Sequence, residues 1–149
     1  MTLPSGIISA LTFCPVYDPS YRLFAAGSLS PSSGNSSNIA LFDEETGGRP
    51  VGWVGNIKAS VMQVRSPSRV EALADLFMKL AFNPVKPHIL YASFRRRDEI
   101  YAWDLRGDTV TPLQTFSQGD DQVFDTNQKM KFDIDLGGNL LGVGGQVSV

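Results

Sequence analysis

The stretch IYAWDLR at residues 100–106 decides the fold of this chain. Its aromatic and branched residues favour a β-strand, which ends at a Trp-Asp pair just before the turn residues 106–108. An earlier stretch, IALFD at residues 39–43, has the same form and ends in Phe-Asp. Two strands that end in an aromatic residue and an aspartate indicate an internal repeat.

The same order of strands and turns recurs along the chain. The units contain IISALTFCP (7–15), LFAAGS (23–28) and IALFD (39–43); LAFNP (80–84), ILYAS (89–93) and IYAWDLR (100–106); then KMKFDID (129–135) and LLGVG (140–144). Repeats of about 40–45 residues that end in Trp-Asp are typical of the four-stranded blades of a β-propeller. The sequence therefore predicts an all-β fold, a partial WD-repeat β-propeller of about two and a half blades. It forms a single region over residues 1–149, with blade units at about 6–56, 57–118 and 119–149.

The Trp-Asp pair has a mechanical role in such a blade. We expect the indole of Trp103 to fill the space between neighbouring blades, and the Asp104 carboxylate to accept hydrogen bonds that fix the strand-to-turn geometry. Phe42 and Asp43 are the corresponding pair one blade earlier. Asp104 as a catalytic acid would need a second carboxylate at a plausible position, and the sequence offers none.

Composition excludes several kinds of function. The chain has 13 Lys+Arg against 15 Asp+Glu, so any contact with nucleic acid must come from a local basic patch. No apolar run approaches the ~20 residues that cross a bilayer, so no membrane partner is expected. The single cysteine, Cys14, and the single histidine, His88, cannot close a structural zinc site. Counting alone leaves a Cys/His catalytic pair open, but both residues flank prolines and carry no family signature. We expect no enzyme, metal or cofactor.

One segment breaks the period of the repeat. Phe13 and Phe82 lie 69 residues apart, whereas Phe82 and Phe132 lie 50 apart, and the excess falls in VRSPSRVEALADLFMK at 64–79. The segment has a helical pattern, in which the following residues form a capping box and an apolar face: Ser68, Glu71, Val70, Leu73, Ala74, Phe77 and Leu80. One interpretation is therefore a short helical insertion between blades.

A second interpretation is an in-frame retained intron. Deleting residues 64–79 joins SVMQ (60–63) to LAFNP (80–84), and the joined nine residues align without a gap to residues 7–15. The first aromatic interval then falls from 69 to 53 residues. Both interpretations stay open, and sequencing of the transcript distinguishes them.

Two stretches of the chain carry a family resemblance. RRDEIYAWDLR (96–106) and TNQKMKFDID (126–135) resemble the telomerase Cajal body protein family of WD-repeat proteins, in a form similar to its fungal members. AAGS at residues 25–28 also matches the pattern of the family, so the resemblance covers most of the chain outside 64–79. The Gly-His pair that often opens a WD blade is missing, and a closed propeller of this kind needs about seven blades.

The resemblance implies a non-catalytic scaffold in the nucleus, located in Cajal bodies or similar structures. Such a scaffold binds small nuclear or Cajal-body RNAs and RNP proteins, and serves RNA trafficking and telomerase or spliceosomal RNP biogenesis. Nucleotide binding is not expected, because no Gly-x-x-x-x-Gly-Lys-Ser/Thr loop is present. The alternatives are a generic WD protein–protein interaction module and a truncated or mis-spliced fragment without independent function.

Basic residues in the second and third units are the candidates for RNA contact. They are Arg95, Arg96 and Arg97 at the tip of a predicted hairpin, and Arg106, Lys129 and Lys131 in later elements. Arginine on a rigid loop suits bidentate phosphate contacts and stacking on unpaired bases. The competing interpretation is a solvated turn, in which the arginines pair with Asp98 and Glu99.

Overall fold

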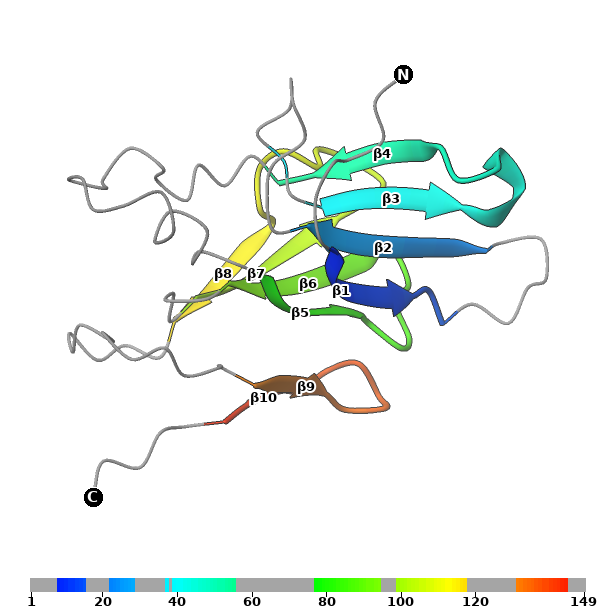
Figure 1. Cartoon of the computed structure of the whole chain (residues 1–149). Helices are drawn as coiled ribbons and strands as arrows, with labels where there is room; N and C mark the ends of the chain where they lie inside the picture. The colour runs from blue at the N-terminus through cyan, green and yellow to red at the C-terminus, as the bar shows by residue number, and fades with distance from the viewer. Residues whose placement is uncertain are drawn as a thin grey trace, which may run out of the picture.

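Three antiparallel β-sheets make up the described part of the chain, as the computed structural model shows (Figure 1). The structure describes residues 8–15, 22–28, 37, 39–55, 77–94, 99–117 and 131–144. Within these residues the protein is all-β apart from one short 3-10 turn, η1 (Glu44–Thr46), and no helix is long and apolar enough to cross a membrane. The predicted fold class is therefore confirmed at the level of an all-β protein.

The first two sheets have the same topology. The first sheet contains β1 (Ile8–Phe13), β2 (Leu23–Ser28), β3 (Ile39–Asp43) and β4 (Pro50–Val54), adjacent in chain order. The second sheet contains β5 (Phe77–Phe82), β6 (Ile89–Phe94), β7 (Glu99–Asp104) and β8 (Gln114–Ser117), in the same order. A hairpin of β9 (Phe132–Ile134) and β10 (Leu141–Val143) follows. Each sheet falls within one of the three units expected from the sequence.

The pairing of the strands shows that the first two sheets are equivalent residue by residue. Leu11 pairs with Ala26 and Leu80 with Ala92, and each pair occupies the same place in its sheet. Both first strands carry the same irregularity, between Ile8 and Ala10 in β1 and at the corresponding point of β5. The interval of 69 residues between Phe13 and Phe82 therefore joins equivalent positions.

The third unit is aligned differently from the sequence-based expectation. The backbone N–H groups of Cys14, Asn83 and Asp135 make the same closing hydrogen bond, with N···O distances of 2.9, 2.9 and 3.0 Å. Asp135 is thus the equivalent of Asn83, and Ile134 is the equivalent of Phe82. Aligning Phe82 with Phe132 is wrong by two residues, and the second interval is 52 residues, close to the 53 obtained without residues 64–79.

The predicted helix over 64–79 is wrong at its C-terminal end. Residues 77–79 open strand β5, and Phe77 and Leu80 pair with Phe94 and Ala92 of β6. Pairing with β6 overrides the local 3.6-residue pattern here, because the strand buries Leu80 between two sheets. Residues 64–76, with the predicted capping box, lie outside the described residues.

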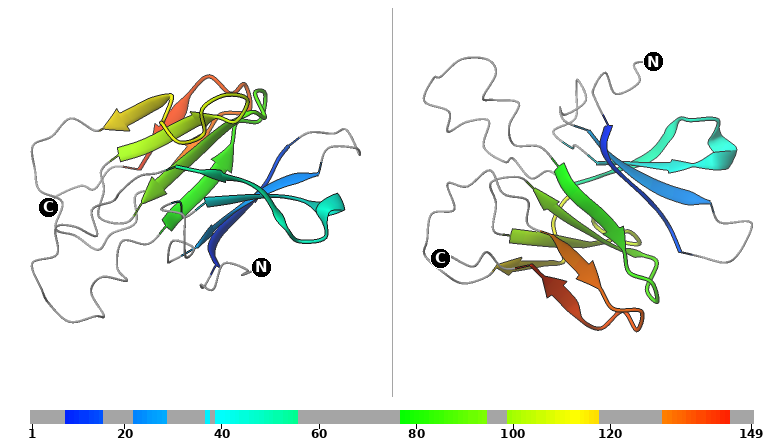
Figure 2. Two further views of the ribbon diagram at one scale, coloured as in Figure 1. Left: turned by 90° about the horizontal axis from the view of Figure 1, so that it is seen from above. Right: turned by 60° about the horizontal axis from the view of Figure 1, so that its bottom comes forward.

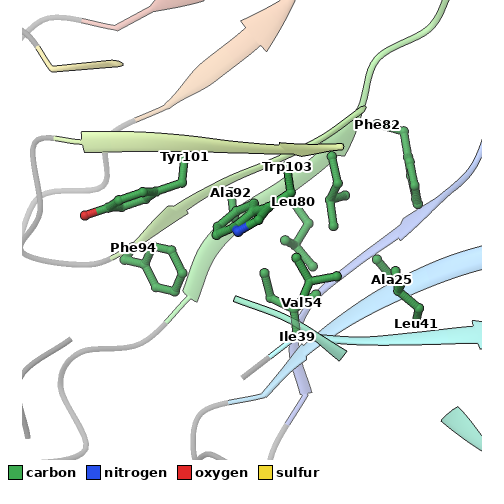
Figure 3. Packing of buried hydrophobic residues seen from close by; sticks show 11 residues of the cluster. Ala25, Ile39, Leu41, Val54, Leu80, Phe82, Ala92, Phe94, Tyr101 and Trp103 are labelled. Carbon is green, nitrogen blue, oxygen red and sulfur yellow. The ribbon is translucent and has the colours of Figure 1, made fainter. Parts of the chain in front are cut away.

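The core lies between the first two sheets, where large side chains meet small ones (Figure 3). The second sheet contributes bulky residues, and the first sheet contributes aliphatic residues: Leu80, Phe82, Leu90, Phe94, Tyr101 and Trp103 against Ala25, Ile39, Leu41 and Val54. Trp103 is fully buried at this interface. Its indole N–H has no hydrogen-bond partner among the residues that the structure describes, so packing alone stabilises its position.

The hairpin packs on the other face of the second sheet. The Lys79 ammonium donates to the carbonyl oxygen of Phe132 and lies 5.1 Å from the centroid of its ring. The Asn83 side-chain amide donates to the carbonyl oxygen of Gly138 at 2.8 Å. A Cβ atom on Gly138, which has φ of +68°, would lie 2.3 Å from Asn83 Oδ1, so only glycine permits this approach.

These contacts predict how the chain responds to shortening. Deletion of residues 64–79 places VMQ (61–63) where residues 77–79 open β5, whereas deletion of 61–76 removes the same number of residues and keeps 77–79. We expect both variants to retain the sheets, because each leaves three residues to pair with β6. Loss of Lys79 should make the first variant less stable by about 1 kcal/mol.

Far-UV circular dichroism and urea unfolding measure both effects. The deletion of 61–76 is the matched control, since it closes a loop of the same length. Loss of β-structure in both variants would show that the fold requires the segment between β4 and β5. It would contradict the expectation that 16 residues of this segment can be deleted.

Candidate nucleic-acid interface

The Trp-Asp carboxylate is bound within its own turn. Asp104 accepts hydrogen bonds from the Arg106 backbone N–H and Nε, both at 3.0 Å, and from Nη2 at 2.7 Å. Both carboxylate oxygens are therefore engaged, with Arg106 bound in a bidentate manner. These hydrogen bonds from Arg106 lower the pKa of Asp104 well below its usual value of 3.8, and they raise the pKa of Arg106.

Asp43 occupies the equivalent turn of the first sheet. Its carboxylate accepts from the Glu45 backbone N–H at 2.9 Å, and the Thr46 hydroxyl donates to its carbonyl oxygen at 2.8 Å. Phe42, the preceding residue, is buried on the face of the first sheet that points away from the second. Both aromatic-Asp pairs thus place the ring in a packed layer and the carboxylate in a turn.

Asp135 uses its carboxylate in the same way in the hairpin. Oδ1 accepts from the backbone N–H groups of Asn139 and Leu140, each at 2.7 Å. These hydrogen bonds lower the pKa of the Asp135 carboxyl, and the bond from the Leu140 N–H has the largest effect. Sequence analysis assigned no role to this residue, although the sequence Asp-Leu-Gly-Gly-Asn at 135–139 is a recognisable turn signal.

The structure separates the described basic candidates. Arg106 follows Asp104, which pairs with Ile89 where β6 begins. Lys131 is exposed and lies at the start of β9, next to Phe132, to which Lys79 of β5 donates. Arg106 therefore lies at one end of the second sheet, and Lys131 lies near the other end, where β5 begins.

The remaining candidates are Arg95, Arg96, Arg97 and Lys129, which lie outside the described residues. The strands that residues 95–98 connect are β6 and β7, and these meet at the end of the sheet where β5 begins, since Phe77 pairs with Phe94. Glu99, a proposed partner of these arginines in a solvated turn, accepts a hydrogen bond from the Tyr101 hydroxyl.

Sequence analysis missed Lys79 as a basic residue at this end of the sheet. Its ammonium lies 3.4 Å from Asp133 Oδ1, in addition to its contacts with Phe132. The lysine therefore joins the second sheet to the hairpin. Lys79 and Lys131 are equivalent, since each directly precedes a buried residue of the first strand of its unit. The alignment of Phe82 with Phe132, which is wrong by two residues, hid this equivalence.

Cys14 and His88 are placed near the loop between β5 and β6. The Cys14 thiol donates a weak hydrogen bond to the carbonyl oxygen of Pro87 at 3.7 Å and packs against the core. The His88 carbonyl oxygen accepts from the Leu105 backbone N–H at 2.8 Å. Among the described ranges, no group of three or more histidine, cysteine or acidic residues is arranged to hold a metal ion.

Comparison with known proteins adds no assignment. No protein-family model matches the chain, and no curated protein sequence matches it.

The contact between Asp104 and Arg106 predicts a pH-dependent stability. Because folding lowers the pKa of Asp104, its stabilising effect is complete above the ordinary value of 3.8 and is lost as the pH falls through the lower folded value. Arg106→Gln should move the Asp104 pKa upward towards 3.8, but not fully, since the backbone N–H remains a donor.

Carboxyl NMR titration measures this pKa directly. Arg22→Gln is the control, because Arg22 pairs with Glu44 at 2.9 Å and does not contact Asp104. An unchanged Asp104 pKa in the Arg106 variant would refute the assigned cause.

Proposed function

We propose that the chain is part of a WD-repeat β-propeller that acts as a non-catalytic scaffold for small nuclear RNA and its RNP proteins. The observation that carries the proposal is the recurrence of one four-stranded unit, with the same register and with an aromatic-Asp turn after its third strand. Residues 126–135, which carry the most specific part of the family resemblance, lie in the third of the units expected from the sequence.

The arrangement of the sheets supports a propeller. The first strands of the units contact one another, β1 with β5 and β5 with β9, and β5 and β9 run in the same direction (Figure 2). Each sheet is built outward from its first strand in chain order. Stacked sheets with their first strands side by side are the arrangement of blades around a central axis.

The placement of charge supports an RNA surface at one end of the second sheet. Lys131 and the strand ends that flank residues 95–97 lie at the end where β5 begins, whereas Arg106 lies at the opposite end and is paired with Asp104. We therefore assign RNA contact to Arg95, Arg96, Arg97 and Lys131, in a nuclear, Cajal-body-like location. Arg106 has a structural role in the turn.

RNA binding should be salt-dependent and confined to this end. We expect a synthetic RNA stem-loop with an unpaired loop to bind the chain, with a logarithmic slope against salt of about −0.7 for each single-strand phosphate contact. Replacement of Arg95–Arg97 by alanine should reduce that slope by about 2. Filter binding at several salt concentrations measures it.

The matched control is Arg106→Ala, which removes one positive charge from the opposite end. An equal loss of affinity in the control, after correction for the number of charges, would show non-specific attraction. Absence of binding at low salt would reject the RNA surface.

A protein-interaction module without RNA contact is the second candidate. It is favoured by exposed apolar residues on β1, among them Leu11 and Phe13. Retention of partner proteins that is insensitive to salt, with no RNA retained, would support it over the scaffold for RNA.

A further inference from the structure

The loop between β7 and β8 joins the second sheet to the first. It comprises residues 105–113 and lies beside the end of β4 (Figure 1). The backbone N–H of Gly55, which directly follows β4, donates to the carbonyl oxygen of Thr109 at 2.7 Å. The loop then returns to its own sheet, where the Leu113 backbone N–H donates to the carbonyl oxygen of Ala102 at 2.7 Å. A hydrogen bond between the first two sheets therefore depends on the conformation of this loop.

The carboxylate of Asp108 fixes that conformation. Its Oδ1 accepts from the Val110 backbone N–H at 2.8 Å, and the carboxylate also accepts from the hydroxyl and the backbone N–H of Thr111. These hydrogen bonds lower the pKa of the Asp108 carboxyl, and the bond from Val110 has the largest effect. Such a side chain replaces backbone hydrogen bonds in a turn. Thr109 lies inside this turn, which therefore sets the direction of its carbonyl oxygen towards Gly55.

Thr111 is the threonine of this loop that an enzyme can reach. It is exposed, and its apolar neighbours Val110 and Leu113 are 53% and 64% exposed. Pro112 follows directly, and a residue before proline favours an extended backbone. An exposed hydroxyl in an extended segment, next to a residue without an N–H group, suits the cleft of a proline-directed kinase. Thr109, in the same loop, is partly buried and precedes a valine.

We propose that Thr111 is a phosphorylation site of a proline-directed serine/threonine kinase, and that its phosphate loosens the contact between the first two sheets. The Thr111 hydroxyl oxygen attacks the γ-phosphorus of ATP and forms the new P–O bond. The bond between the γ-phosphorus and ADP breaks, and ADP leaves with the electron pair. The hydroxyl proton passes to a base of the kinase.

The phosphate acts on the turn through its charge. A phosphothreonine carries a charge of about −1.5 to −2 at pH 7, and it lacks the hydroxyl proton that Asp108 accepts. Arg106, the basic residue of the loop, is bound to both carboxylate oxygens of Asp104 and does not neutralise the phosphate. Repulsion from Asp108 therefore opens the turn and weakens the hydrogen bond between Thr109 and Gly55. The proposal goes beyond the scaffold function and does not depend on RNA contact.

Site-resolved mass spectrometry tests the modification. The other serine–proline pairs of the chain begin at Ser30 and Ser66, and both serines are replaced by alanine so that Thr111 is the remaining acceptor before a proline. A purified mitogen-activated protein kinase with ATP should then add a single phosphate at Thr111. Pro112→Ala should lower the initial rate about tenfold or more. Thr109→Val is the matched control and should leave the rate unchanged, whereas Thr111→Val should abolish labelling.

Amide hydrogen exchange tests the effect on the two sheets. Phosphorylation should raise the exchange rate of the Gly55 amide about five- to tenfold, which corresponds to the loss of one hydrogen bond. The Leu105 amide, which donates to the carbonyl oxygen of His88 at 2.8 Å, is the internal control and should not change. In Asp108→Asn the side-chain oxygen still accepts from Val110 but carries no charge. Phosphorylation of this variant should therefore raise the Gly55 rate by less than about twofold.

Three results would overturn the proposal. Absence of phosphate at Thr111 would show that the folded loop is not a substrate. Labelling that Pro112→Ala does not reduce would show that recognition is not directed by proline. An unchanged or slower exchange of the Gly55 amide in the phosphorylated chain would show that the phosphate does not loosen this contact. RNA plays no part in these measurements, so their failure is distinct from failure of the proposed function.

Discussion

The structure depends on the packing of bulky side chains from one sheet onto small side chains of the sheet before it. Trp103 illustrates this constraint, because its indole is fully buried between the first two sheets although its N–H has no partner in the described part of the chain. A buried N–H without a partner costs about 1–3 kcal/mol, so burial of apolar surface must exceed that cost. Neither four-stranded sheet offers this burial alone, which makes adjacent sheets mutually dependent.

The turns position the strands that supply these faces. Carboxylate or amide oxygens of Asp43, Asn83, Asp104 and Asp135 each accept backbone N–H groups at a turn. Such side chains replace backbone hydrogen bonds where the chain reverses direction, and they fix which residue enters the next strand. Turn geometry therefore accounts for the carboxylates of Asp43, Asp104 and Asp135.

Much of this fold was predictable from the sequence, because alternation and turn residues identify short strands. The strands around Leu11, Leu41, Leu90 and Trp103 follow from those patterns. The start of β5 was not predictable, since residues 64–80 satisfy a helical period and only pairing with β6 selects the strand. Strands β4 and β8 were missed because β4 begins at Pro50 and contains a glycine, and because Phe116 is the only apolar residue of β8.

The candidate interface was predictable only as a set of residue types. Sequence reasoning identified the basic residues, but not that Arg106 is paired with Asp104, nor that Lys79 joins the second sheet to the hairpin. The contact of Lys79 depends on which strand ends meet, and local sequence does not encode that. The contact between Asp104 and Arg106 lies within a single turn.

The central claim is that the first two sheets form one cooperative unit through Trp103. Amide hydrogen exchange of the wild-type chain and of Trp103→Ala tests it, with Trp103→Phe as the control that retains an aromatic ring. The account predicts that the alanine variant loses protection in β2 and β3 as well as in β6 and β7, by an amount corresponding to about 3–5 kcal/mol. Loss of protection confined to β5–β8, with the first sheet unchanged, would contradict it.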